Sequence, residues 1–373
     1  MPRLPRGLRK PFLGATCALL LLAILEAGAR LSGAVAPARA GGDFYSAFRD
    51  LLVDLGGFRG ADRVLEPDPE LFWKLRPGVR DVPWHPPLFR DNRSNALGYR
   101  DPERGYAAAP GALRLLCLGD SCTYGMGVRA ADSYPQRLEA LLANAYTDRL
   151  VEVWNGGVPG WSSDQGRVLL KRDGERVAPA FVTVAFGVND RYHWDLGHHE
   201  RRGHGRCITD REARARLATA TARLDRALGR LALYRLLGRL LRRDRAEEPA
   251  AAGEGSMRVP EEEYRDNLRA IAAEARRLGA QPVFVVWPIR WQIEKPPDGE
   301  LEAPTSHQLA TRAAGREFGV PVVDLLERLT GQDGLYVDSV HMNEEGCRRV
   351  ALEIGSLLYE LQLLPEPPRP APR

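Results

Sequence analysis

Cysteine is scarce in this 373-residue chain, and neither sign of charge is in large excess. The cysteines are odd in number and none forms a Cys-x-x-Cys pair, so the sequence indicates neither a disulfide framework nor a zinc site. Lysine and arginine total 53 against 49 acidic residues, a net charge of +4. With no zinc-finger or RNA-binding motif beside it, this balance predicts no nucleic-acid partner. Lysine is rare relative to arginine, which is typical of a GC-rich bacterial genome.

Long apolar runs are also lacking, except for one at the N-terminus. The segment "MPRLPRGLRK" is basic and is followed by the uncharged "PFLGATCALLLLAIL". A basic flank before an apolar segment directs the downstream chain across a membrane. We predict an anchor from about residue 12 to 33, near the ~20 residues that a span needs. The main part of the chain would then lie outside a bacterial cell membrane. The alternative is secretion after cleavage near Ala38-Arg39-Ala40.

Changes in composition divide the chain into segments. We expect residues 1–40 to form the basic region, the anchor or signal sequence, and a linker. A loop-rich extension would cover 41–111, where proline, asparagine and aspartate are frequent. The main domain is expected over 112–365, with an insertion at about 191–260, and 366–373 is a proline-rich tail.

Short β-rich runs alternate with helical patterns throughout the main domain. The runs are "LRLLCLG" (113–119), "LVEVWN" (150–155), "FVTVAFG" (181–187), "QPVFVVWP" (281–288) and "VPVVDL" (320–325). Continuous apolar strands separated by helices indicate a parallel sheet that is covered on both faces. The sequence therefore predicts an α/β fold with a five-stranded parallel sheet.

The insertion interrupts this alternation of β-rich runs and helical patterns. Its middle part, "REARARLATATARLDRALGRLALYRLLGRLLRRDR", has apolar residues at helical spacing between arginines. This pattern fits a helix packed on the domain with a solvated arginine face, or a lid or membrane-surface helix. The insertion also holds histidines at positions 193, 198, 199 and 204. Because no cysteine or carboxylate accompanies them at ligand spacing, we expect a polar loop and no metal.

Polar residues follow the strands at the points where each strand ends. Ser121 comes directly after the first run, Gly160 after the second and Asn189 after the third. Asp338 and His341 follow the last run. Because ligands of open parallel sheets bind outside the carboxyl ends of the strands, we expect these five residues to meet.

Each of these residues has a chemical use, although a serine after a strand can also be a turn residue or a phosphate ligand. The first loop has too few glycine and hydroxyl residues for a phosphate cradle. A serine hydroxyl needs a base, and His341 is the natural one, with Asp338 holding its other nitrogen. The N–H groups of Ser121 and Gly160 and the amide of Asn189 would form an oxyanion hole.

The segments "GDSCTYG", "NGGVPG", "GVND" and "DSVH" resemble the four blocks of the SGNH (GDSL-type) hydrolase superfamily, in that family's order and spacing. The resemblance implies a three-layer α/β/α sandwich with a flavodoxin-like five-stranded parallel sheet, and neither a metal nor another cofactor. It also implies that Ser121 is the nucleophile, that Asp338 and His341 complete the triad, and that Gly160 and Asn189 are oxyanion donors. Cys122 replaces the family's usual leucine.

The resemblance implies a serine esterase, and the N-terminal segment predicts that it is membrane-anchored or secreted. We expect it to remove a short acyl group from a polysaccharide or lipid through an acyl-enzyme. An O-acyltransferase would use the same site, and a catalytically silent carbohydrate-binding protein is the third alternative. Trp161 and Trp194 are candidates for a substrate platform, and Asp190 for a further substrate contact, although hydrogen bonding within the fold also explains Asp190.

Overall fold

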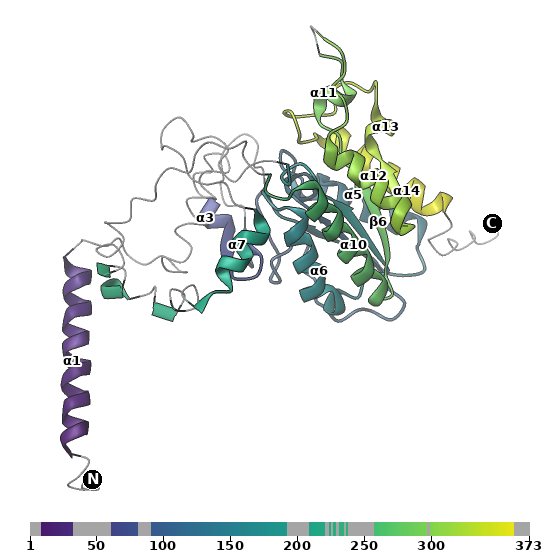
Figure 1. Cartoon of the computed structure of the whole chain (residues 1–373). Helices are drawn as coiled ribbons and strands as arrows, with labels where there is room; N and C mark the ends of the chain where they lie inside the picture. The colour runs from purple at the N-terminus through teal and green to yellow at the C-terminus, as the bar shows by residue number, and fades with distance from the viewer. Residues whose placement is uncertain are drawn as a thin grey trace. The chain divides into compact units, whose positions relative to one another are not determined.

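The computed structural model describes residues 9–32, 61–80, 91–191, 209–220, 257–296 and 299–361, with 224, 227–228, 231–234 and 236–237 (Figure 1). The chain divides into two compact units. One comprises Met1–Leu51 and Arg214–Ala251, and the other comprises Leu52–Ala213 and Ala252–Arg373.

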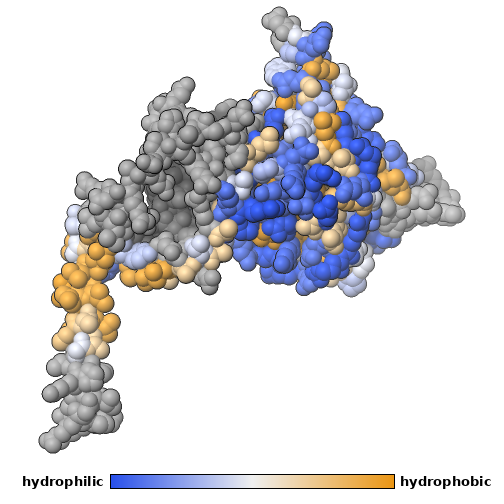
Figure 2. Space-filling view, viewed as in Figure 1, coloured by the Kyte–Doolittle hydropathy of each residue, from blue (hydrophilic) through white to orange (hydrophobic). Residues whose placement is uncertain are grey.

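The first unit contains a long apolar helix, α1 (Arg9–Leu31). Its window Gly14–Leu31 has a mean hydropathy of 1.6 and is only 6% buried. Hydrophobic residues dominate its described surface in Figure 2. By length and composition α1 is able to cross a membrane, as an anchor or as a signal sequence. Near its end, the Glu26 carboxylate accepts hydrogen bonds from the N–H groups of Ala232 and Leu233 and from Arg30.

The second unit is built on a parallel sheet of five strands in the order β4-β3-β5-β6-β7. The strands are β3 (Leu113–Gly119), β4 (Val151–Gly157), β5 (Phe181–Ala185), β6 (Gln281–Val286) and β7 (Val322–Asp324). In the register, Gly119 lies opposite both Gly157 and Ala185. Three strands therefore end at one level, and the chain segments that follow them emerge together.

Helices cover both faces of this sheet. On one face α5 (Tyr134–Ala145) packs against α14 (Glu344–Glu360), and on the other α10 (Glu261–Arg277) packs between α6 (Ser163–Val177) and α12 (Ser306–Phe318). Figure 1 shows α6 and α10 side by side over the sheet. The three-layer α/β/α fold with a flavodoxin-like strand order confirms the predicted fold class. Shorter helices are α3 (Ala61–Val64), α4 (Ser121–Tyr124), η3 (Ala130–Asp132), α7 (Asp210–Leu217), α11 (Arg290–Ile293) and α13 (Leu325–Leu329).

The sequence of the packed helices explains which side they bury. In α10 the buried side chains recur every three or four residues, and they are Tyr264, Leu268, Ile271, Ala272 and Ala275. This spacing forms one apolar stripe along a helix, and the charged residues between them face outward.

The described part of the N-terminal extension includes regular secondary structure. Strands β1 (Leu65–Asp68) and β2 (Phe72–Leu75) form an antiparallel hairpin. The Asp68 carboxylate stabilises the turn by accepting the N–H groups of Glu70 and Leu71. Leu71 and Trp73 are fully buried, so this hairpin is attached to the domain and does not stand alone.

Several sequence-based predictions concern segments outside the described residues. They include the histidine-containing loop, Trp194 and the tail. Of the long amphipathic helix expected in the insertion, the structure describes α7 and scattered residues beyond it. Among these, Leu224, Leu231 and Leu237 are 50%, 42% and 48% exposed.

Candidate active site

Ser121 is the first residue of α4, directly after β3. The carboxylate of Asp120 caps this short helix by accepting the N–H of Cys122 at 2.8 Å. The neighbouring backbone is packed closely: a Cβ on Gly157 would lie 2.2 Å from the amide nitrogen of Tyr124. Glycine at the end of β4 therefore allows the helix that carries Ser121 to sit against the sheet.

The structure brings Ser121, His341 and Asp338 into one chain of hydrogen bonds. His341 Nε2 lies 2.8 Å from Ser121 Oγ, and His341 Nδ1 lies 2.7 Å from Asp338 Oδ2. Ser121 and His341 are 8% and 9% exposed, so little water surrounds them. The second oxygen of Asp338 accepts the N–H groups of Val340 and His341, which fixes the loop before α14.

The surroundings of Asp338 favour its charged form. Burial alone raises the pKa of Asp338, but the hydrogen bond and charge of His341 and the two backbone N–H groups outweigh it and lower the pKa below its usual value. Asp338 is therefore a carboxylate at neutral pH, and it is suited to stabilise a positive charge on His341.

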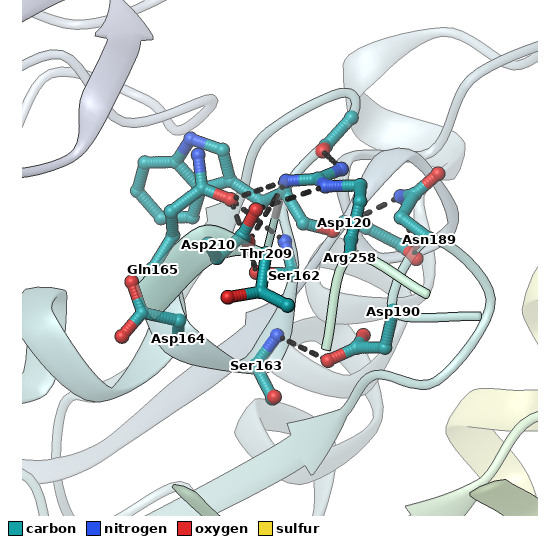
Figure 3. A network of polar contacts seen from close by, with 12 residues as sticks. Asp120, Ser162, Ser163, Asp164, Gln165, Asn189, Asp190, Thr209, Asp210 and Arg258 are labelled. Atoms are coloured by element: carbon teal, nitrogen blue, oxygen red, sulfur yellow. Dashed lines mark hydrogen bonds and ion pairs between the residues drawn. The ribbon is translucent and has the colours of Figure 1, made fainter. Parts of the chain in front are cut away.

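Asn189 lies in the loop after β5, and its side chain is held in place. Its Nδ2 donates to Asp120 Oδ2 at 3.1 Å and to the carbonyl of Trp161 at 3.0 Å (Figure 3). Burial raises the pKa of Asp120 to about 6, against the lowering effect of the Cys122 N–H and His341. Both amide hydrogens of Asn189 have partners, so an oxyanion would have to share one of them.

Gly160 lies in the loop after β4, with a φ of 79° that favours glycine. Its carbonyl oxygen accepts a hydrogen bond from Arg258. The guanidinium of Arg258 also donates to Gln165 and to both carboxylate oxygens of Asp210. Arg258 and Asp210 are 0% and 1% exposed, and Figure 3 shows them at the centre of a polar network beside Asn189.

This buried ion pair was not identified from the sequence. Asp210 and Arg258 lie 48 residues apart, on either side of the middle of the insertion. Neither belongs to a motif, and an arginine in a chain rich in arginine gives no signal. Only the folded structure brings the two residues together, because both ends of the insertion contact the segment that follows β4.

Two residues predicted to contact substrate, Trp161 and Asp190, are buried in this structure. Trp161 is 1% exposed, and its indole N–H donates to the carbonyl of Trp73. Asp190 is fully buried, and its carboxylate accepts the N–H groups of Ser163 and Gly187. Its two hydrogen bonds join the loop after β5 to the start of α6, which fits the predicted role in hydrogen bonding within the fold.

The segment 95–101 forms hydrogen bonds with the end of α4 and with β4, and so helps to hold Ser121 in place. Arg100 is fully buried and donates to the carbonyls of Tyr124, the last residue of α4, and of Gly125 and Val128 beyond it. The neighbouring Asp101 accepts the N–H of Asn155 in β4. These contacts fix the C-terminal end of the helix that carries Ser121.

Asp101 gives a pH-dependent contribution to stability. Burial raises its pKa to about 7, against the opposing charge of Arg104. Because the pKa of Asp101 is higher in the folded protein than in the unfolded chain (about 4), its contribution is present below pH ~4 and is lost as the pH rises through ~7. We expect the unfolding free energy of the wild type, relative to Asp101→Asn, to fall by about 2.5 kcal/mol between pH 5 and 8. Urea unfolding of both proteins at each pH measures this, and parallel pH curves would contradict it.

No group of three or more histidine, cysteine, aspartate and glutamate side chains is arranged to hold a metal ion within the described part of the chain. The four histidines of the insertion lie outside that part. The chemistry considered below uses only the chain's own side chains and backbone.

The sequence motifs lie within a region that matches a known protein family. Residues 117–349 match the model of the GDSL-like Lipase/Acylhydrolase family. The hairpin β1–β2 and the segment 95–101 precede this match.

Several solved structures are remotely similar. TesA has 17% identity and a TM-score of 0.42, covering 67% of this chain and 99% of its own. A lipase/acylhydrolase from Enterococcus faecalis has 15% identity and a TM-score of 0.41, covering 67% and 96%. A catalytic mutant of an acetylxylan esterase from Geobacillus stearothermophilus has 15% identity and a TM-score of 0.40, covering 66% and 94%. No curated protein sequence matches the chain.

Proposed function

Because this chain belongs to the GDSL-like lipase/acylhydrolase family and is thereby an ester hydrolase, we propose that it cleaves acyl esters with Ser121, His341 and Asp338 as its triad. The observation that carries the proposal is the pair of hydrogen bonds, 2.8 Å and 2.7 Å long, that join the three side chains. A nucleophile, a base and a group that orients the base are the minimum that such a reaction needs.

In the proposed reaction, Ser121 Oγ attacks the ester carbonyl carbon while His341 Nε2 takes the hydroxyl proton. The carbonyl electron pair moves to oxygen and gives a tetrahedral oxyanion. When this collapses, the bond to the alcohol breaks and His341 returns the proton to the leaving oxygen. Water then attacks the acyl-enzyme with His341 again as base, which releases the acid and restores Ser121. Asp338 stabilises the imidazolium in both halves.

The N–H groups of Ser121 and Gly160 and the amide of Asn189 are the proposed donors to the oxyanion. One such donor contributes about 3–4 kcal/mol to transition-state stabilisation. The positions of these residues, at the ends of β3, β4 and β5, support the assignment. Asn189 would contribute by sharing a hydrogen that it now gives to Asp120 or Trp161.

We also propose a short acyl group on a polysaccharide or lipid as the substrate, and a position at or outside the cell membrane. The low exposure of Ser121 and His341 favours small acyl groups over long chains. The apolar helix α1 supports a membrane anchor or an export signal.

The test uses the full-length protein in detergent micelles with p-nitrophenyl acetate, butyrate and octanoate. We expect turnover that falls with acyl length, and labelling of Ser121 by an alkyl fluorophosphonate, located by peptide mass spectrometry. A protein that neither turns over these esters nor takes the label would contradict the proposal. Adding methyl glucoside as an acceptor separates the alternatives, because acyl transfer that exceeds acid release would indicate a transferase.

A further inference from the structure

The hairpin β1–β2 contacts the loop that carries Gly160. Here the oxyanion loop means residues 158–161, between β4 and α6. The indole N–H of Trp73, in β2, donates to the carbonyl of Pro159 at 2.9 Å, across 86 residues of sequence. Trp73 is fully buried. It also precedes the matched region 117–349, so the family motifs do not include it.

This hydrogen bond acts on the peptide group that holds the proposed oxyanion donor. The carbonyl of Pro159 and the N–H of Gly160 belong to one planar unit, and in a trans peptide they point in opposite directions. A bond that fixes the carbonyl oxygen therefore also fixes the direction of the N–H. Such fixing matters here because glycine, with its positive φ of 79°, restrains its own backbone less than any other residue.

Further contacts hold the same loop. The Trp161 indole N–H donates to the carbonyl of Trp73 at 2.9 Å, so β2 and the oxyanion loop each donate one indole N–H to a backbone carbonyl of the other. From the other side, Arg258 donates to the carbonyl of Gly160 at 2.6 Å. Its guanidinium lies 5.8 Å from the centre of the Trp73 ring. The carbonyls of Pro159 and Gly160 thus each accept a hydrogen bond from a buried side chain in a distant part of the chain.

We propose that Trp73 is a positioning residue for the oxyanion loop, and that its indole N–H keeps the Gly160 N–H aimed at the developing oxyanion. This inference rests on the proposed function. It makes the N-terminal hairpin part of the catalytic apparatus, although the hairpin contributes no group to the triad.

Loss of the Trp73 N–H is expected to weaken transition-state binding and leave substrate binding largely intact. Removal of an oxyanion donor itself costs roughly 100-fold or more in kcat, and misalignment costs less, so we expect a fall of about 10-fold. KM should change by less than about 2-fold. The pH profile should keep its shape, because Ser121, His341 and Asp338 are unchanged. A purely structural role would instead lower the number of active molecules.

The experiment compares Trp73→Phe with Trp154→Phe in the full-length protein in detergent micelles. Trp154 is also fully buried, but its indole nitrogen has no hydrogen-bond partner among the described residues. Rates of p-nitrophenyl acetate hydrolysis are divided by the amount of enzyme that an alkyl fluorophosphonate labels. We expect the 10-fold loss of kcat in Trp73→Phe alone. Equal kcat values for Trp73→Phe and the wild type, or equal losses in both variants, would overturn the inference.

A third variant separates the hydrogen bond from packing and serves if Trp73→Phe does not fold. Replacing Trp73 by 3-benzothienylalanine keeps the shape of the ring system and substitutes sulfur for the N–H. The same 10-fold loss supports the inference, and full activity overturns it. Wild-type turnover that survives Ser121→Ala would overturn the proposed function itself, and would be recognised before either Trp73 variant is measured.

Discussion

Replacing Ser121 by alanine is expected to lower kcat for p-nitrophenyl acetate by at least ~10³-fold, and replacing His341 by alanine is expected to do the same. The reason is that the two side chains act as one unit, joined by the 2.8 Å hydrogen bond between Nε2 and Oγ. Without the base the hydroxyl is a poor nucleophile, and without the hydroxyl there is nothing for the base to activate. The double variant should therefore be no slower than either single one.

Asp338→Asn belongs in the same series. An asparagine keeps the approximate shape but loses the charge that faces His341 Nδ1 at 2.7 Å, so we expect a loss close to that of the other two variants. Ser356→Ala is the matched control for Ser121→Ala, because it makes the same substitution at an exposed serine on α14. Steady-state hydrolysis assays with p-nitrophenyl acetate measure kcat for all of these variants. Residual activity within 10-fold of the wild type in Ser121→Ala would rule out Ser121 as the nucleophile.

Replacing Arg258 by methionine is expected to reduce the free energy of unfolding by about 3–5 kcal/mol. The substitution leaves the carboxylate of Asp210 buried without its counter-charge, and it removes the donors to Gly160 and Gln165. Burial already raises the pKa of Asp210 to about 6, against the lowering effect of Arg258. Without Arg258 the charged form is less favourable still, so the destabilisation should be larger at pH 8 than at pH 5.

Two further variants test whether burial is the cause. Arg348 forms an ion pair with Glu345 in which both side chains are 45% exposed, and Arg348→Met should cost less than about 1 kcal/mol. In the double variant Arg258→Met/Asp210→Leu no uncompensated charge remains, so much of the stability should return. Urea unfolding followed by tryptophan fluorescence gives these free energies. A loss below about 1 kcal/mol in Arg258→Met would show that the pair does not stabilise the fold.

The sequence predicts the sheet well, because its strands are buried on both faces and therefore continuous in hydrophobicity. The run expected at 113–119 matches β3, and the runs at 181–187, 281–288 and 320–325 contain β5, β6 and β7. Strand β4 begins inside the run at 150–155 and extends two residues beyond it. The run expected at 181–187 is too long, because β5 ends at Ala185 and the following residues turn toward Asn189. Apolar character continues past the strand and conceals its end.

The sequence is less informative about the long-range contacts that keep the site residues in position. Strands β1 and β2 have four residues each, one contains Pro67, and Phe72 has a positive φ, so no alternating pattern marks the hairpin. The hydrogen bond from Trp73 to Pro159 and the ion pair of Arg258 join residues far apart in sequence. Such contacts follow from tertiary packing and leave no local signal. The same packing explains why Trp161, which lies beside the site in sequence, faces the interior.

The separation of Ser121 and His341 by 220 residues has a consequence for biosynthesis. At ~5–20 residues per second, the ribosome adds His341 roughly 11 to 44 s after Ser121. Throughout that interval the nascent chain holds the proposed nucleophile but not its proposed base, and β6 and β7 are added only in the later part of it. On the proposed assignment, the growing chain cannot attack ester bonds until His341 has been added, which is after all five strands of the parallel sheet have been synthesised.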